Sequence, residues 1–157
     1  MPGEALLIGI ATIAVAVAGF TAVTSTLRPP GGAWSAPMRI RQRAIVSTSF
    51  NVVFEALAPL ILFAATNDEH TAMRFASAGV AVYATGIVTW RTRQFMRARA
   101  QMTGSMLVLL TLGPAATVLF WLNALVVASL AVFATALCLQ LSVAVVSFYS
   151  LVSAAQE

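Results

Sequence analysis

The chain has 157 residues and a net charge of +4, but 60% of its residues are hydrophobic and only 9% are charged. A soluble domain carries about 25% charged residues, so this composition excludes a water-soluble fold and predicts an all-α integral membrane helical bundle. The single cysteine, Cys138, excludes an intramolecular disulfide and a cysteine-based metal site. The basic residues lie in short segments between apolar stretches, so we expect lipid rather than nucleic acid as their partner.

Five stretches are long and apolar enough to cross a bilayer, which takes about 20 helical residues. In chain order the predicted spans cover residues 5–27, 44–66, 71–90, 105–122 and 126–150. The uncharged stretch 104–152 is too long for one crossing, so we expect a turn near Trp121-Leu122-Asn123. The first span lacks the positively charged start of a signal peptide and is retained. Residues 1–157 thus form one transmembrane domain of five helices, with four helices as the alternative.

The arginines predict the orientation of the spans. Eight of the nine basic residues lie between spans one and two or between spans three and four. Positive loops stay in the cytoplasm, so we expect the N-terminus outside and the C-terminus inside a bacterial cytoplasmic membrane. Pro37 is expected in the first turn of the second helix, which then begins before its apolar span. The candidate contacts to anionic headgroups are Arg39, Arg41, Arg43, Arg91, Arg93, Arg97 and Arg99.

A short polar turn separates spans two and three. Its four residues, Asn67-Asp68-Glu69-His70, predict an antiparallel helical hairpin. Asp68 is a suitable N-cap for the following helix. The turn also contains possible metal ligands, but a capped turn accounts for its residue types, and no metal site is expected.

Small residues recur along three of the predicted spans. Such faces let membrane helices approach closely, either within one chain or between chains. Packing within the chain, self-association and binding of another membrane protein therefore all remain open. The three sets are Ala14, Ala18 and Ala22; Ser77, Ala81 and Thr85; and Ala131, Thr135, Cys138 and Ser142.

Glu55 is the only carboxylate inside a predicted span, and it lies about 16 Å from either end of that span. Ser47, Asn51 and Glu55 follow one another at four-residue spacing and form a polar stripe. Pro59 continues the stripe and cannot donate to the carbonyl oxygen of Glu55. Ionisable groups inside membranes commonly serve ion or proton pathways, so the stripe is a candidate proton or cation path.

The alternative is that a protonated Glu55 binds a neighbouring span and only stabilises the packing. An apolar environment favours the neutral form of a carboxyl, so this alternative is physically reasonable. Gln140, near the centre of the fifth span, completes the set of candidate intramembrane polar residues. The possible partners of Glu55 are Thr111, Thr117, Tyr83 and Gln140.

Catalytic motifs are missing from the sequence. It contains no GxSxG, no HExxH and no phosphate-binding glycine loop. We therefore expect no enzyme activity and no cofactor. Two functions remain: a non-catalytic assembly or accessory component, which we prefer, and a small oligomeric channel or proton-linked transport protein that uses the stripe of Ser47, Asn51 and Glu55.

Several short segments carry a family resemblance. They are Gly32-Ala33-Trp34-Ser35, Arg39-Ile40-Arg41, Leu57-Ala58-Pro59-Leu60-Ile61-Leu62 and Trp121-Leu122-Asn123-Ala124-Leu125. Together with a first span that ends in arginine, this pattern resembles small bacterial multi-span membrane proteins of about the same length. The resemblance implies a multi-pass protein of the inner membrane. That family has no assigned activity, so the resemblance implies no site residue.

Overall fold

A computed structural model describes residues 1, 3–26, 36–98 and 104–153. Within these residues the fold is all-α, and five helices are long and apolar enough to cross a membrane, as predicted. A short π-helix, η1, precedes the last of them. The elements are α1 (Glu4–Thr26), α2 (Ala36–Thr66), α3 (Glu69–Ala98), α4 (Gly104–Leu122), η1 (Asn123–Val127) and α5 (Leu130–Ser153).

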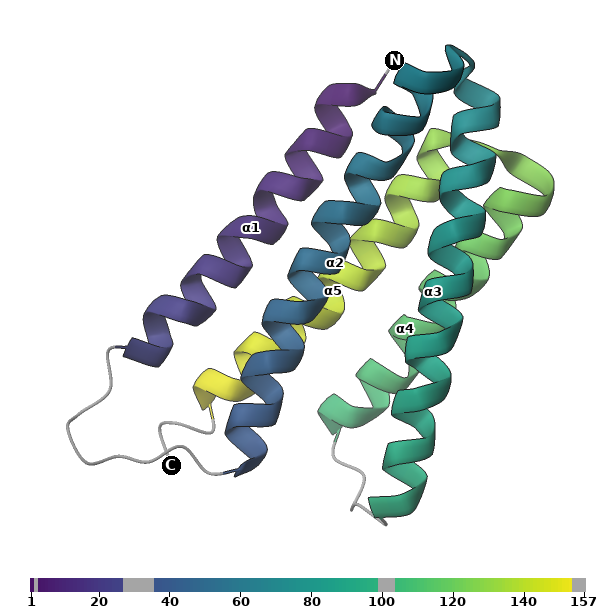
Figure 1. The fold of residues 1–157 in the computed structure, drawn as a ribbon. Coiled ribbons are helices and arrows are strands. Elements are labelled where there is room, and N and C mark those ends of the chain that lie inside the picture. Colours follow the sequence, from purple (N-terminus) through teal and green to yellow (C-terminus); the bar gives the residue numbers. More distant parts are fainter. Residues whose placement is uncertain (2, 27–35, 99–103, 154–157) are drawn as a thin grey trace.

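Four of the helices form a closed bundle, and the fifth covers one side of it. α2 packs against α3 and α5, and α4 packs against the same two helices. α1 packs against α2 and α5. Figure 1 shows that the N-terminus, the α2–α3 turn and the α4–α5 turn lie at one end of the bundle. The start of α2 and the ends of α3 and α5 lie at the opposite end, which we call the arginine end because it contains Arg43, Arg91 and Arg93.

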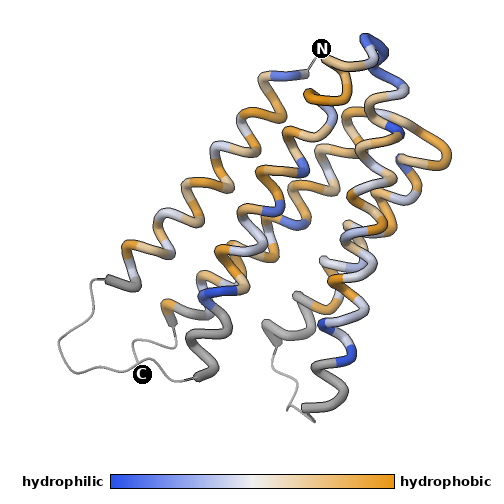
Figure 2. Tube along the Cα trace, in the orientation of Figure 1, coloured by the Kyte–Doolittle hydropathy of each residue, from blue (hydrophilic) through white to orange (hydrophobic). Residues whose placement is uncertain are grey.

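Hydrophobic residues dominate the helices, and strongly hydrophilic residues lie near the helix ends and also in the middle of α2 and α5 (Figure 2). The largest buried side chains include Phe120 and Phe133, whose rings meet edge to face at a centroid distance of 5.3 Å and join α4 to α5. Leu7 of α1 and Val52 of α2 belong to the same core. The core therefore connects the outer helix α1 to the closed bundle.

Two helices extend beyond the apolar spans predicted for them. α2 begins at Ala36, so that Pro37 lies in its first turn as expected, and α3 continues to Ala98. The span boundaries were predicted from apolarity, but a helix continues wherever its backbone hydrogen bonds can form. The polar ends of α2 and α3 are therefore helical although they are not apolar.

The α4–α5 turn lies later than predicted. Trp121 and Leu122 remain helical, η1 follows, and the backbone turns at Ala128, which has a left-handed φ of 47°. α5 consequently begins at Leu130 rather than at residue 126. Asn123, chosen as a residue that tolerates non-helical backbone, instead ties the turn together. Its carbonyl accepts from the Ala128 N–H at 2.8 Å, and its Oδ1 accepts from the Ser129 N–H at 2.7 Å.

Contacts from α3 complete this turn. The Asn123 amide is fully buried and donates to the Ser77 hydroxyl at 2.8 Å. Arg74 donates from Nε and Nη2 to the carbonyls of Ala124 and Leu125, each at 3.2 Å. Carbonyls at a helix end lack hydrogen-bond donors within the helix, and the Arg74 side chain provides donors to these two carbonyls. Sequence reasoning gave Arg74 no role, because its partners lie 50 residues away.

Candidate functional site

Glu55 is buried in the middle of α2, with only 6% of its surface exposed. Its carboxyl interacts with the side-chain amide of Gln140 on α5. The second carboxyl oxygen, Oε2, has no hydrogen-bond partner among the described residues. α2 runs without interruption through Pro59, which has no N–H to offer the carbonyl of Glu55. The backbone carbonyl of Glu55 thus lacks the α-helical hydrogen bond from residue 59, at the same level of the bundle as the unpartnered Oε2.

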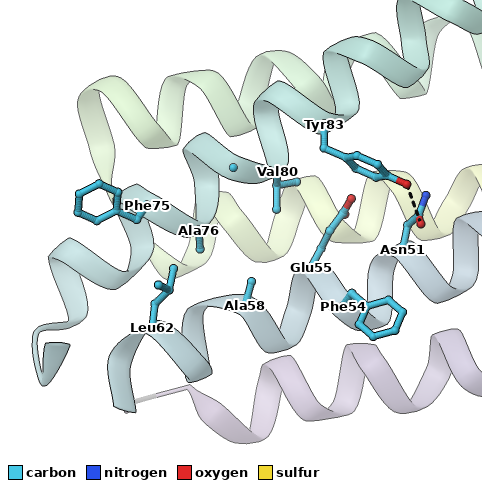
Figure 3. A pocket seen from close by; sticks show the side chains of 10 residues that line it. Asn51, Phe54, Glu55, Ala58, Leu62, Phe75, Ala76, Val80 and Tyr83 are labelled. Carbon is cyan, nitrogen blue, oxygen red and sulfur yellow. Dashed lines mark hydrogen bonds between the residues drawn. The ribbon is translucent and has the colours of Figure 1, made fainter. Parts of the chain in front are cut away.

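Glu55 lines a hollow between α2 and α3 that has a volume of about 390 Å³ and opens to the outside of the bundle. We call this hollow the α2/α3 groove. Figure 3 shows the Glu55 carboxyl pointing from α2 toward the part of α3 that carries Val80 and Tyr83. The groove is lined by Asn51, Phe54, Glu55, Ala58, Leu62, Phe75, Ala76, Gly79, Val80 and Tyr83. Its lining is apolar except at one end, where Asn51, Glu55 and Tyr83 lie.

The other proposed partners of Glu55 are engaged elsewhere or face outward. The Tyr83 hydroxyl donates to Asn51 Oδ1 at 3.1 Å (Figure 3). The Thr117 hydroxyl donates to the Gly113 carbonyl of its own helix at 2.9 Å. Thr111 is exposed on α4. Among the predicted partners, the structure gives Gln140 an interaction with the Glu55 carboxyl.

The predicted polar stripe changes in exposure along α2. Ser47 is exposed, Asn51 is half-buried and Glu55 is buried. Ser47 does not line the α2/α3 groove but a second hollow of about 400 Å³, which also involves Gln42 and Arg43. The stripe therefore leads from an open surface at the arginine end to a buried carboxyl at the centre of α2.

The candidate headgroup arginines fall into three groups. Arg43 and Arg93 are exposed at the arginine end. Arg91 is half-buried and donates from Nη2 to the Thr48 hydroxyl at 3.4 Å, which links α3 to α2. The backbones of Arg39, Arg41 and Arg97 lie in helices, but their side chains, like all of Arg99, lie outside the described residues.

The three small-residue faces have different surroundings. Ala14 and Ala18 of α1 are buried, as are Ser77 and Ala81 of α3, so these faces serve packing within the chain. Ala22 and Thr85, at the ends of those two faces, are exposed. All four members of the third face, Ala131, Thr135, Cys138 and Ser142 on α5, are exposed.

The α2–α3 turn is a capped turn, as predicted. The Asp68 carboxylate accepts from the backbone N–H groups of His70 and Thr71, each at 3.2 Å. A hydrogen bond from the Thr71 side chain, together with these backbone bonds, lowers the pKa of Asp68 below its usual range. Within the part of the chain that the structure describes, no three His, Cys, Asp or Glu side chains could hold a metal ion together.

No protein-family model, curated protein or solved structure matches the chain. The site is therefore interpreted from its own chemistry. The groove brings an incoming group next to the Glu55 side chain, but Oε2 itself is covered in the isolated chain, so a donor pairs with it only after the carboxyl turns toward the groove.

Proposed function

We propose that this protein is a non-catalytic assembly component of a bacterial cytoplasmic membrane, and that its α2/α3 groove binds a transmembrane helix. The observation that carries this proposal is the unpartnered Oε2 of Glu55, whose side chain lines the open groove although the oxygen itself is covered in the isolated chain. A buried polar atom without a partner costs about 1–3 kcal/mol. An incoming donor recovers that free energy only in the assembled state, so the groove favours assembly.

The proposal includes the orientation of the bundle. Arg43, Arg91 and Arg93 lie at the arginine end, and positively charged ends of membrane helices stay in the cytoplasm. The N-terminus then lies outside and the C-terminus inside. The arginines contact anionic headgroups, each contributing about 1 kcal/mol to membrane attachment.

The depth of Glu55 favours a helix over a lipid as the occupant of the groove. Glu55 lies about 16 Å from either end of its apolar span, so a lipid headgroup at the interface does not reach it. Acyl chains reach this depth but carry no hydrogen-bond donor. A transmembrane helix brings a polar side chain to this level with its own backbone hydrogen bonds already satisfied.

Photocrosslinking in native membranes tests this proposal. Phe75, at the groove, and Phe20, on the outer face of α1, are 65% and 66% exposed and form a matched pair for replacement by a photoreactive residue. We expect a discrete protein adduct from position 75 that disappears in Glu55→Leu, and only lipid adducts from position 20. Lipid adducts alone at position 75, or a protein adduct that Glu55→Leu leaves unchanged, would contradict the proposal.

A second function, proton-linked transport, is favoured by the graded exposure of Ser47, Asn51 and Glu55. This gradient offers protons a route from the arginine end to a titratable group at the centre. In proteoliposomes, Asn51→Leu and Glu55→Gln should then each abolish proton flux, whereas Thr12→Val on α1 should leave it unchanged. Equal flux in all three variants excludes this function.

A further inference from the structure

The outward side of α5 forms a continuous seam, which we call the α5 outer face. Its residues recur at alternating intervals of four and three, the spacing by which one helix packs along another. All six are exposed: Ala131, Thr135, Cys138, Ser142, Val145 and Tyr149. The first four are small. Large side chains such as Phe20, Phe54 and Phe75 are exposed on α1, α2 and α3, although α1 also exposes the small residues Thr12, Ala16 and Gly19.

The α5 outer face contains polar groups at the depth of Glu55. Gln140 interacts with the Glu55 carboxyl, and Cys138 and Ser142 lie two residues before and after Gln140, about 3 Å along the helix in either direction. Copies of one protein inserted with the same orientation hold equivalent residues at equal depths. Cys138 and Ser142 of one copy therefore lie level with Glu55 of its neighbour.

The α2/α3 groove has a residue spacing that matches the α5 outer face and enough space to accommodate it. Asn51, Glu55, Ala58 and Leu62 line its α2 wall at intervals of four, three and four. On the α3 wall, a Cβ added at Gly79 meets nothing within 4 Å. The bond between Tyr83 and Asn51 fixes the register of the two antiparallel walls, and one turn further along both helices Gly79 lies level with Glu55.

We propose that the partner helix is α5 of a second copy of this chain, seated by its outer face in the α2/α3 groove. This inference rests on the function proposed above and names the occupant of the same groove. In the isolated chain the Ser142 hydroxyl donates to the Cys138 carbonyl at 2.8 Å. In the assembly the Glu55 carboxyl turns toward the groove and brings Oε2, which is covered in the isolated chain, to this hydroxyl. Because a hydroxyl both donates and accepts, it pairs with either protonation state of the carboxyl.

The contact joins two different surfaces, so it does not close within a dimer. Each copy offers its α5 outer face to one neighbour and its groove to another, which generates a ring or an open chain. This geometry distinguishes it from a symmetric contact between two α5 helices or between two grooves.

Disulfide crosslinking distinguishes these arrangements, because Cys138 is the only cysteine in the chain. Three proteins are reconstituted in liposomes and oxidised with copper phenanthroline: the wild type, Gly79→Cys, and Gly79→Cys with Cys138→Ala. We expect a ladder of dimers, trimers and higher species from Gly79→Cys alone. Adding Glu55→Leu to that variant should reduce the ladder at least tenfold, while thermal unfolding in detergent shows that the protein remains folded.

Other patterns overturn the inference. Dimers from the wild type show an α5–α5 contact, and dimers from the variant that lacks Cys138 show a groove–groove contact. Ile13→Cys, at an exposed position of α1 nearer the depth of Cys138, keeps Cys138 and is the matched control. A ladder from it as strong as that from Gly79→Cys shows random collision. If crosslinking gives no ladder but position 75 still yields a Glu55-dependent adduct with another protein, the self-assembly fails and the proposed function stands.

Discussion

The α4–α5 turn and the middle of α2 both bury polar side chains, but they treat them differently. At the turn, Asn123 is fully buried and makes hydrogen bonds to Ser77 and Ser129, and Arg74 binds the carbonyls beside it. In the middle of α2, Glu55 is buried to nearly the same extent but keeps one oxygen without a partner among the residues described.

This difference separates a structural role from a binding role. A polar cluster in which every group has a hydrogen-bond partner stabilises the isolated chain fully and gains little free energy from a ligand. A cluster with an unpartnered group destabilises the isolated chain and gains free energy when a binding partner supplies the missing hydrogen bond. The two regions should therefore respond in opposite ways to the loss of their polar groups.

The largest effect is expected for Asn123→Leu, which keeps the size of the side chain but removes its hydrogen bonds. The Ser77 hydroxyl and the Ser129 N–H lose their partners, and the free energy of unfolding should fall by about 2–4 kcal/mol. Asn51→Leu is the matched control, because the bond it removes lies at an exposed position. The stabilities are measured by denaturant titration in mixed micelles. If the two variants are equally stable, the buried hydrogen bonds of Asn123 contribute no more to stability than the exposed bond of Asn51.

Arg74→Met should have the next largest effect. The carbonyls of Ala124 and Leu125 lose their donors, and we expect a decrease of about 1–2 kcal/mol in the free energy of unfolding. Arg74→Lys retains the charge but not the two-pronged donor geometry, so its stability should lie between those of Arg74→Met and the wild type. If the lysine variant is as unstable as the methionine variant, geometry rather than charge accounts for the whole effect.

Glu55→Leu should act in the opposite direction. Leucine removes the buried, unpartnered Oε2, whereas Gln140, which loses its contact with the carboxyl, is only half-buried. The stability of the detergent-solubilised monomer should therefore stay unchanged or rise by about 1 kcal/mol. The same change should abolish crosslinking through the groove. A loss of stability as large as that of Asn123→Leu would show that Glu55 is a structural group, and the contrast between the two regions would disappear.

The smallest effect concerns Asp68. Its hydrogen bonds lower its pKa in the folded protein below the ordinary value of 3.8, so it stabilises the fold above that value and loses this contribution as the pH falls through the folded pKa. The thermal midpoint of the wild type should thus fall slightly more between pH 5 and pH 2.5 than that of Asp68→Asn. If the thermal midpoints of the wild type and Asp68→Asn fall in parallel with pH, the Asp68 carboxylate does not cause the loss of stability.

Features that depend on local order could be predicted from the sequence. Five apolar stretches became five helices, because a helix satisfies its backbone within its own segment and needs only sufficient length to cross a membrane. Asp68 capped α3 because its partners, His70 and Thr71, follow it directly. Glu55 stood out because a charge in an apolar span is costly wherever the helix packs.

Features that depend on distant partners could be predicted at most as one candidate among several, as Gln140 was for Glu55. Arg74 bonds to residues 50 and 51 positions away, and Tyr83 bonds to Asn51, 32 positions away. Contacts of this kind also set the position of the α4–α5 turn. The small-residue faces of α1, α3 and α5 looked alike in the sequence. Only the α5 face is exposed along the whole predicted set, and no periodicity distinguishes it from the others.

The sequence by itself determined the class of the protein, its five apolar helices and the single carboxyl that needs an explanation. Composition and spacing are sufficient for these, since apolarity and helical hydrogen bonding are properties of one segment at a time. Only the tertiary structure decided that Glu55 reaches Gln140 but keeps a free acceptor, and that an open groove lies beside it. Those facts depend on the depth and rotation of each helix against its neighbours, which packing sets and no single segment contains.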